Sequence, residues 1–414
     1  MSTEPSQPPL TRASVEEAHA LIKPYIHETP VLTNTALNNL ASTPRTAAEL
    51  EGTEWAGREP ANPIIRFHFK CENFQKIGAF KARGAFHAIE RLKQEPGWEE
   101  SGGRDKGVVT HSSGNHAQAL SLAASIAHIP AFVVMPAISP PPKIAATKGY
   151  GATITFSGPT APEREAVTNQ VMKFTGARLI PPYDHPHIIA GQGTAALELE
   201  SQVSPVSLNA VITPCGGGGL LSGTALTFSE SKTKVFGAEP NFEGANDAQR
   251  GYYSGKRVES VKSLTVADGL RTFLGKLPWE IIYERRLVDG IYSVSEDEIK
   301  KALRLVYERM KVVVEPSAVV GLAVALYNED FRKMVETEGG KEGWDLGVVF
   351  SGGNNVGHTN NNKRWPASRS LECWIGVAGY ENPRWGFASN RKVSGSNAWP
   401  PGSLISRETS SQYR

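Results

Sequence analysis

The sequence predicts an α/β fold with mainly parallel sheets. Short runs of β-branched and apolar residues alternate with helix-length segments, as expected for strands joined by crossover helices. A Ser295-Glu298 capping box begins one such helix, which has Ile299 and Ala302 on its apolar face. At 414 residues, the chain can hold two domains. The expected strands are 108–110, 131–135, 153–156, 210–213, 235–238 and 347–350.

The composition is that of an ordinary globular enzyme, with 40% hydrophobic and 21% charged residues. A net charge of +2 gives no reason to expect nucleic acid or a membrane surface as a partner. Cys71, Cys215 and Cys373 are scattered, which favours neither a disulfide framework nor a zinc site. No secretory signal and no apolar run of roughly 20 residues is present. We therefore expect a cytoplasmic protein.

The two ends of the chain and one internal stretch differ from the alternating pattern. Residues 1–13 are expected to form a flexible arm, followed by a helix that a capping box at Ser14 begins and that runs to about Ile26. Residues from about 38 to 62 predict an exposed insertion. Residues 357–414 are polar and atypical and predict a disordered tail, although their tryptophans favour some burial or a partner.

Lys81 lies between Gly78-Ala79-Phe80 and Arg83-Gly84-Ala85, at the start of a helical pattern. A partly buried lysine held beside an aromatic ring favours its neutral amine, which can attack a carbonyl carbon. In a chain with 44 Lys and Arg, a surface lysine would be the default interpretation. Two further motifs lie downstream, in the order expected for pyridoxal phosphate binding. They favour a reactive Lys81 over a surface lysine.

Four consecutive glycines, from Gly216 to Gly219, follow the strand expected at 210–213 and precede a helix expected at Leu220. They leave backbone N–H groups free to surround a phosphate at a helix N-terminus. No Gly-Lys-Ser/Thr follows, so a Walker loop is not predicted. A tight turn is the alternative, but four glycines exceed what a turn requires.

The segment from His111 to His116 follows the strand expected at 108–110. Its small and amide residues can present N–H donors to a carboxylate, and Asn115 can hydrogen-bond a phenolic oxygen of a cofactor ring. A Ser-His hydrolase would compete, but no Gly-x-Ser-x-Gly elbow is present. Either histidine could instead be a packed residue without chemistry, which is the interpretation we favour for His111.

Two further motifs are ambiguous when taken alone. Ser351-Gly352-Gly353-Asn354 again ends a strand and could place a hydroxyl at a pyridine nitrogen, but taken alone it is more simply explained as a common turn. Residues 191–196 match the dinucleotide pattern G-x-G-x-x-A. A poor strand precedes them and no acidic residue follows at about 20 positions, so nicotinamide binding is disfavoured.

Together these segments resemble the fold type II pyridoxal-phosphate family, specifically its serine racemase and serine/threonine dehydratase branch. The similarity runs from about Val15 to Asn354. It implies two open, twisted, mainly parallel sheets flanked by helices and a homodimer. It also implies a large cofactor-binding domain of residues 14–106 and 185–356 and a small domain of residues 107–184. The matching segments are 78–85, 112–116, 190–194, 214–219 and 351–354.

The resemblance assigns roles to individual residues. Lys81 binds pyridoxal 5'-phosphate covalently, Phe80 packs against the ring, Asn115 contacts the ring oxygen, and Ser351 faces the pyridine nitrogen. Residues 191–194 become a structural turn. Arg164 and Asp268 are expected to meet polar groups of the substrate, with a surface salt bridge as the alternative for Arg164. The phosphate is expected at Gly216, Gly217, Gly218 and Gly219, and the substrate carboxylate at Ser112, Ser113, Gly114 and His116.

The activity implied first is that of an L-serine/L-threonine dehydratase, an ammonia-lyase giving pyruvate or 2-oxobutyrate. Lys81 would be the general base, and a neutral Ser351 suits rapid loss of a β-hydroxyl. Serine racemase, alone or combined with the lyase, is the alternative. Racemase-type members have serine where Ser113 stands, whereas many dedicated threonine dehydratases have alanine. A hydroxyaspartate dehydratase and a non-catalytic cofactor-binding protein are further alternatives.

The resemblance also raises a divalent cation, Mg²⁺ or Ca²⁺, held by hard oxygen ligands. Relatives have Glu-Pro followed by an Ala-Asp-Asp-like segment. Here Glu239-Pro240 is followed by Ala245-Asn246-Asp247, with two extra residues between them. Glu239, Ala245 and Asp247 are the expected ligands, and a solvated acidic loop is an equally supported alternative.

Overall fold

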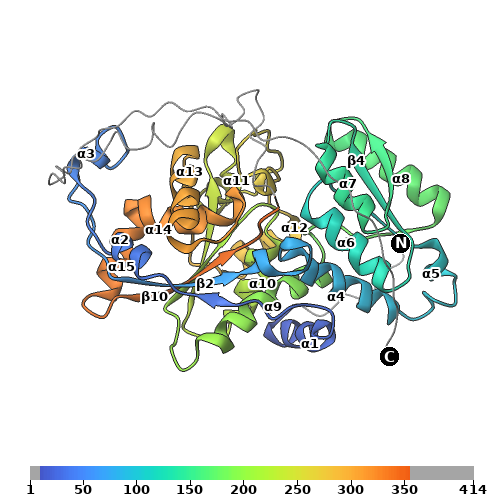
Figure 1. The fold of residues 1–414 in the computed structure, drawn as a ribbon, viewed down its shortest axis with the longest axis horizontal. Helices are drawn as coiled ribbons and strands as arrows, with labels where there is room; N and C mark the ends of the chain where they lie inside the picture. Colours follow the sequence, from blue (N-terminus) through green and yellow to red (C-terminus); the bar gives the residue numbers. More distant parts are fainter. Residues whose placement is uncertain (1–9, 355–414) are drawn as a thin grey trace, which may run out of the picture. The chain divides into compact units, whose positions relative to one another are not determined.

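The computed structural model describes residues 10–354, which form two sheets with helices on their faces (Figure 1). The larger sheet has the order β1-β2-β10-β7-β8-β9. All its neighbouring strands are parallel except β1, which pairs antiparallel with β2. Its strands are β1 (Val31–Leu32), β2 (Ile65–Cys71), β7 (Ala210–Pro214), β8 (Lys234–Pro240), β9 (Gly290–Val294) and β10 (Trp344–Phe350).

The smaller sheet is parallel throughout and has the order β5-β4-β3-β6. It lies in the green part of Figure 1, beside helices α6, α7 and α8. Its strands are β3 (Val108–His111), β4 (Ala131–Pro136), β5 (Thr153–Ser157) and β6 (Arg178–Leu179). All six predicted strands are present, and the predicted α/β class is confirmed. Strands β1, β2, β6 and β9 were not predicted.

The α-helices lie around the two sheets (Figure 1). The first of them are α1 (Arg12–Ile22), α2 (Thr35–Ala41), α3 (Ala47–Leu50), α4 (Lys81–Lys93), α5 (Gly103–Lys106), α6 (Asn115–Ile126), α7 (Pro141–Gly149) and α8 (Ala161–Thr175). Those that follow are α9 (Pro186–Val203), α10 (Gly219–Phe228), α11 (Asp247–Ser254), α12 (Lys276–Trp279), α13 (Glu296–Leu305), α14 (Val320–Tyr327) and α15 (Glu329–Gly339).

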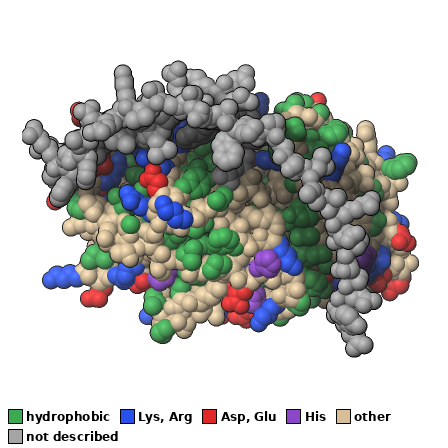
Figure 2. Space-filling view, viewed as in Figure 1, with side chains coloured by type: hydrophobic (Ala, Val, Ile, Leu, Met, Phe, Trp, Pro, Cys, Tyr) green, Lys and Arg blue, Asp and Glu red, His purple; other side chains and the backbone are tan. Residues whose placement is uncertain are grey.

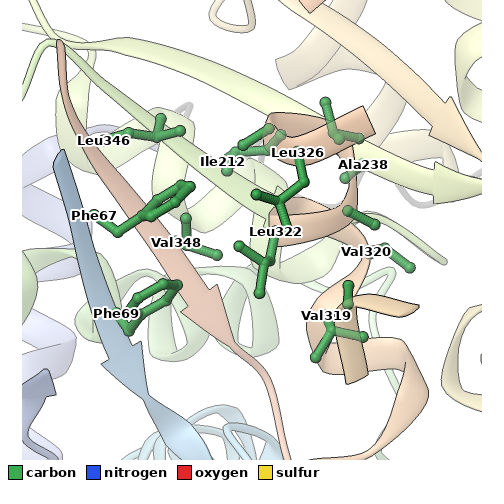
Figure 3. Close-up of a cluster of buried hydrophobic side chains, with 14 of the residues drawn as sticks. Phe67, Phe69, Ile212, Ala238, Val319, Val320, Leu322, Leu326, Leu346 and Val348 are labelled. Carbon is green, nitrogen blue, oxygen red and sulfur yellow. The ribbon is translucent and has the colours of Figure 1, made fainter. Parts of the chain in front are cut away.

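Alternating side chains of the larger sheet enter two different cores, as expected for a sheet buried on both faces. Ile212 and Val348 pack with Leu322 of α14 on one face (Figure 3). Val211 and Val349, their neighbours in sequence, pack on the other face with residues of α9 and α10. The smaller sheet is likewise covered by α4 and α6 on one face and by α8 on the other.

Two predicted helix termini can be compared with the structure. The capping box of α13 is present, since the Glu298 carboxylate accepts the Ser295 N–H at 2.8 Å. The first helix is different. It begins at Arg12, after an N-cap at Thr11, and ends at Ile22, not at Ile26. Ser14 is therefore inside the helix, where its Oγ accepts the Thr11 N–H at 3.1 Å. The cause is that Thr11, two residues before the expected arm ends, is itself a capping residue.

The remaining predictions on chain organisation are not decided by the structure. The expected tail at 357–414 and most of the expected arm lie outside the described residues. The stretch predicted as an exposed insertion contains buried Leu50, Trp55 and Ala61 beside many exposed residues. No helix within residues 10–354 is long and apolar enough to cross a membrane. Charged side chains of both signs are interspersed on the face shown in Figure 2.

Candidate active site

Several of the predicted site residues directly follow the carboxyl ends of parallel strands. Strand β3 ends at His111, β7 at Pro214 and β10 at Phe350. The loops that follow contain Ser112–Gly114, the four glycines and Ser351, respectively. Ligands in open α/β sheets bind at this edge, so the topology supports a site built from all three loops.

Lys81 is the first residue of α4. Its Nζ donates a hydrogen bond to the carbonyl oxygen of Pro182 at 2.7 Å and lies 5.1 Å from the centroid of the Phe80 ring. Burial lowers the pKa of Lys81 to about 8, because a desolvated ammonium is disfavoured. The amine can therefore lose its proton near neutral pH, as a nucleophile or a general base requires.

The turn before Lys81 is joined directly to the end of β10. The Phe80 N–H donates to the Ser351 carbonyl at 3.0 Å, and the Gly353 N–H donates to the Gly78 carbonyl at 2.9 Å. Gly78 has φ of 68°, and a Cβ there would lie 2.6 Å from the side-chain oxygen of Asn354. These contacts fix the Lys81 and Ser351 segments against each other.

The four-glycine loop leads into α10, whose N-cap, Gly218, has a left-handed φ of 88°. A Cβ on Gly217 would lie 2.2 Å from Cγ of Tyr183, and one on Gly218 would lie 2.4 Å from Leu274. Only glycines fit between these neighbours. The bare backbone at the start of a helix is suited to a phosphate group, so the loop fits pyridoxal phosphate.

Tyr183 was missed by the sequence analysis, which treated its segment only as a poor strand. Its hydroxyl is 3.0 Å from that of Thr272, and its ring covers Gly217. Burial raises the pKa of Tyr183, so the hydroxyl stays protonated. The Pro182 carbonyl beside it holds Lys81. The Pro-Pro-Tyr-Asp run was the available signal, since such a run predicts a structured turn.

The loop between β3 and α6 holds the expected carboxylate-binding residues. Ser112 Oγ accepts the Gly114 N–H at 3.3 Å, and Ser113 is partly exposed. His116 is buried, and its Nε2 lies 3.2 Å from the Ile180 carbonyl. Burial, reinforced by the charge of Lys81, lowers the pKa of His116 to about 3. His116 is therefore neutral and anchors the loop next to Lys81.

Asn115 is held by two residues from distant parts of the chain. Its Nδ2 donates to Glu315 at 3.0 Å, and its Oδ1 accepts from Asn354 at 3.1 Å. One N–H of Asn115 remains for a further acceptor. Burial, and then the charge of Asp268, raise the pKa of Glu315 to about 7. Glu315 was not predicted, although a Glu-Pro-Ser motif ahead of the apolar run at 318–326 marks it.

The two residues expected to meet the substrate's polar groups lie in different settings. Asp268, in the 3₁₀ helix Asp268–Leu270, forms an ion pair with Lys143 of α7 at 2.5 Å. Arg164, on α8, donates to the Pro159 carbonyl at 3.2 Å. Burial lowers the pKa of His111 most, and the charge of Arg164 lowers it further. No ion pair of Arg164 is found within residues 10–354, and its role at the substrate stays a prediction.

The expected metal ligands lie at and after the end of β8, with Glu239 in that strand and Asp247 at the start of α11. The Glu239 carboxylate accepts the N–H groups of Ala248 at 3.2 Å and Gln249 at 2.8 Å. Asp247 Oδ2 accepts the Leu274 N–H at 2.9 Å, while its Oδ1 is buried and has no partner. Burial raises the pKa of Asp247 to about 6 and, together with Asp247, raises that of Glu239.

No cluster of three or more His, Cys, Asp or Glu side chains able to hold a metal occurs in the described part of the chain. The two carboxylates would therefore need carbonyl and water oxygens to complete a shell, which is usual for Mg²⁺ and Ca²⁺. The unpartnered oxygen of Asp247 fits a cation. The longer loop is accommodated by Glu243, whose φ is 50°.

A buried network of charges lies behind Lys81. The guanidinium of Arg83 donates to both oxygens of Glu72 and of Glu198, at 2.7 to 2.8 Å. It also donates to the hydroxyl of Thr194 at 3.1 Å. Nζ of Lys70 donates to Glu198 at 2.7 Å. Two cations and two carboxylates balance, so this network adds no net charge near the amine of Lys81.

Comparison with known proteins establishes the family. Residues 55–352 match the family described as "Pyridoxal-phosphate dependent enzyme". The chain belongs to this family of pyridoxal-phosphate-dependent enzymes, and both the resemblance and the fold class predicted from the sequence are confirmed.

Individual relatives are also similar over most of their length. The chain is 43% identical over 349 residues to a serine racemase of Dictyostelium discoideum, covering 83% of this chain and 95% of the relative. It is 42% identical over 347 residues to an L-threo-3-hydroxyaspartate ammonia-lyase of Saccharomyces cerevisiae, covering 83% and 93%. A crystal structure of the Dictyostelium serine racemase superposes with a TM-score of 0.69 at 43% identity, covering 83% of this chain and 98% of that one.

These relatives correct the main prediction of activity. The sequence analysis placed an L-serine/L-threonine dehydratase first, but three relatives at 41–43% identity are serine racemases. Serine racemase, the alternative activity predicted from the sequence, is therefore better supported. The error arose because a neutral Ser351 was weighed more heavily than the hydroxyl of Ser113. Residues 191–194, expected to form a turn, also lie inside α9.

Proposed function

We propose that the protein is a serine racemase that uses pyridoxal 5'-phosphate. The observation that carries this proposal is the 43% identity to a serine racemase over 95% of that protein's length. Ser113, on the loop that precedes α6, supports it because its hydroxyl can carry a proton. Helices α4 and α6 pack against each other, which keeps Lys81 and the loop of Ser113 on neighbouring elements.

The cofactor would be held by residues on and beside the loops that follow β3, β7 and β10. Lys81 would bind it covalently, Phe80 would pack against the ring, and the glycines Gly216 to Gly219 would surround the phosphate. Asn115 would use its remaining N–H on the ring oxygen, and Ser351 would face the ring nitrogen. When bound, pyridoxal phosphate supplies an electron sink for a negative charge at Cα of an amino acid.

Racemisation requires one group that removes the Cα proton and another that delivers a proton to the opposite face. With its pKa near 8, the amine of Lys81 can be the first of these groups. The hydroxyl of Ser113 would be the second. Ser112, Gly114 and His116 would orient the substrate carboxylate, with Arg164 and Asp268 at its polar groups.

Product analysis tests this proposal. Purified protein supplied with pyridoxal phosphate and L-serine is expected to form D-serine, measured by chiral chromatography. Ser113→Ala should lower D-serine formation by about 10²- to 10⁴-fold, the usual contribution of a general acid or base. Ser125→Ala, the same change at an exposed position of α6, should leave the rate unchanged.

A wild-type protein that binds the cofactor but forms no D-serine would contradict the proposal. Release of ammonia from L-threo-3-hydroxyaspartate in the same assay would then favour the second candidate, since that activity names a 42% identical relative.

We also propose that Glu239, Asp247 and the carbonyl of Ala245 bind Mg²⁺ or Ca²⁺. The support is the buried, unpartnered oxygen of Asp247 beside a second carboxylate. A homodimer, a cytoplasmic location and the domain boundaries at residues 106/107 and 184/185 remain predictions. Sedimentation of the holoenzyme would test the first of them.

A further inference from the structure

The first turn of α4, which carries Lys81, does not cap itself. Its N-cap is Phe80, whose side chain offers no acceptor. The carbonyl of Phe80 accepts the Arg83 N–H at 3.0 Å. The next N–H, that of Gly84, donates to the side-chain oxygen of Gln192 at 3.1 Å. The turn is therefore completed by a residue of α9, which lies more than 100 positions further along the chain.

Two glycines make this contact possible. A Cβ on Gly84 would lie 2.3 Å from Nε2 of Gln192, and one on Gly191 would lie 2.6 Å from Cα of Gly84. No side chain fits at either position, so α4 and α9 approach through bare backbone. The Gly191-Gln192 pair, which the family resemblance assigned to a turn, lies at this close crossing of two helices.

Gln192 is fully buried, and its Nε2 has no hydrogen-bond partner. An unpaired buried amide nitrogen destabilises a protein, and an apolar side chain of similar shape would avoid that cost. The interaction that accounts for a glutamine here is therefore the one made by its oxygen with Gly84.

The same stretch of chain also positions the amine of Lys81. Pro182, four residues before α9 begins at Pro186, accepts the hydrogen bond from Nζ of Lys81 at 2.7 Å. The α9 region therefore contacts both the backbone turn that carries Lys81 and the end of its side chain.

We propose that Gln192 is a positioning residue for Lys81. Through the N–H of Gly84 it fixes the first turn of α4, so that the amine is presented to the cofactor in one geometry. This inference takes one point from the proposed function, namely that Lys81 binds pyridoxal phosphate. It does not depend on which amino acid is the substrate.

Gln192→Met tests the inference, because it keeps the length of the side chain and removes the acceptor. The full-length apoprotein is mixed with pyridoxal phosphate, and attachment to Lys81 is followed by visible absorbance and by mass spectrometry after borohydride reduction. Attachment is expected to slow by about 10- to 100-fold, as for other small misplacements of a reacting group. With the holoenzyme, kcat should fall while KM changes little.

Gln192→Glu provides the conservative rescue. It keeps an oxygen at the same place, and burial should keep the new carboxyl group uncharged near about pH 7. Since Nε2 of Gln192 has no partner, this change breaks no other hydrogen bond. Attachment should return close to the wild-type rate. Thr224→Val, which replaces a buried and unpartnered hydroxyl on α10, is the matched control and should attach the cofactor normally.

The proposal would be overturned if Gln192→Met attached the cofactor at the wild-type rate. It would also be overturned if Gln192→Glu attached the cofactor as slowly as Gln192→Met. Should Gln192→Met not fold, Gln192→Asn replaces it, because the shorter amide withdraws the oxygen; slow attachment supports the proposal and a normal rate refutes it. Failure of the racemase assignment is distinguishable, since it would appear as absence of D-serine from a wild type that attaches the cofactor normally.

Discussion

Two buried charged clusters of this protein are built in opposite ways. Around Arg83, two cations meet two carboxylates, and every guanidinium N–H has an acceptor. Around Glu239, two carboxylates lie together, and one oxygen of Asp247 has no partner. Burial of unpaired charge is costly, so the first cluster is complete as it stands, whereas the second requires a proton or a cation.

The pKa values of the carboxylates express the same contrast. Burial alone would raise the pKa of Glu198, but hydrogen bonds from His19 and Arg83 outweigh it, and the net pKa is well below the usual range. For Glu239, burial and the neighbouring Asp247 both raise the pKa, and the N–H groups of Gln249 and Ala248 and the charge of Arg250 offset them only in part. Glu198 and Glu239 are similarly buried, but their pKa values shift in opposite directions, because only Glu198 has cations in contact with it.

The largest expected effect is that of Arg83→Met. The variant would leave Glu72 and Glu198 buried, with Lys70 and His19 as the remaining partners of Glu198 that can carry a positive charge. Removing one partner from a buried charge network typically costs about 3–5 kcal/mol of unfolding free energy. Urea unfolding followed by circular dichroism measures this loss.

Arg178→Met is the control for that substitution. Arg178 pairs with Glu95 at 2.8 Å, but both side chains are more than 40% exposed. The expected loss is about 0–1 kcal/mol. Similar losses for the two variants would mean that the Arg83 network is no more than a set of surface-like pairs.

The second prediction concerns the cluster that lacks a cation. Mg²⁺ or Ca²⁺ at about 100 times its Kd should stabilise the folded protein by about 2.7 kcal/mol, measured as a shift in Tm with EDTA as the reference. The pKa of Asp247 is raised from 3.8 to about 6, so its ionised form is disfavoured in the folded state. The shift in Tm caused by the cation should therefore be largest above about pH 6 and should shrink as the pH falls towards about 4. Equal Tm with and without either cation at about pH 8 would contradict the proposed site.

The sequence could predict features that depend on contacts between residues close together in the chain, but not those that depend on distant residues. Strands such as β7 and β10, and the motifs at their ends, were predicted because apolar runs and glycines act locally. Strand β2 was missed although Arg66, His68 and Lys70 alternate with apolar residues, because it has no continuous apolar run and follows a stretch rich in Pro and Gly.

Long-range partners could not be predicted in the same way. Arg83 was predicted only as part of the Lys81 motif, because its carboxylate Glu198 lies 115 positions away on another helix. Glu315 was missed for the same reason, since its contact with Asn115 spans 200 positions. Local patterns specify elements, but the partners of a buried charge follow from how those elements pack.

The smallest expected effect is also the sharpest, because one kind of change should have opposite signs in the two clusters. Asp247→Asn removes a like charge and keeps the oxygen that accepts the Leu274 N–H. At about pH 8 in EDTA it should raise the unfolding free energy by about 1–3 kcal/mol, since each pKa unit corresponds to 1.36 kcal/mol. The gain should fade below pH 6, where the wild-type Asp247 becomes protonated.

Glu72→Gln makes the same exchange of an acid for an amide in the balanced network. It turns one acceptor of Arg83 into a donor, so the unfolding free energy should fall by about 2 kcal/mol, the loss of a hydrogen bond to a charged group. Both variants are measured by urea unfolding at the same two pH values. Destabilisation by Asp247→Asn in EDTA would mean that the Glu239 cluster is already balanced by groups of the protein, and a bound cation would then have no electrostatic basis there.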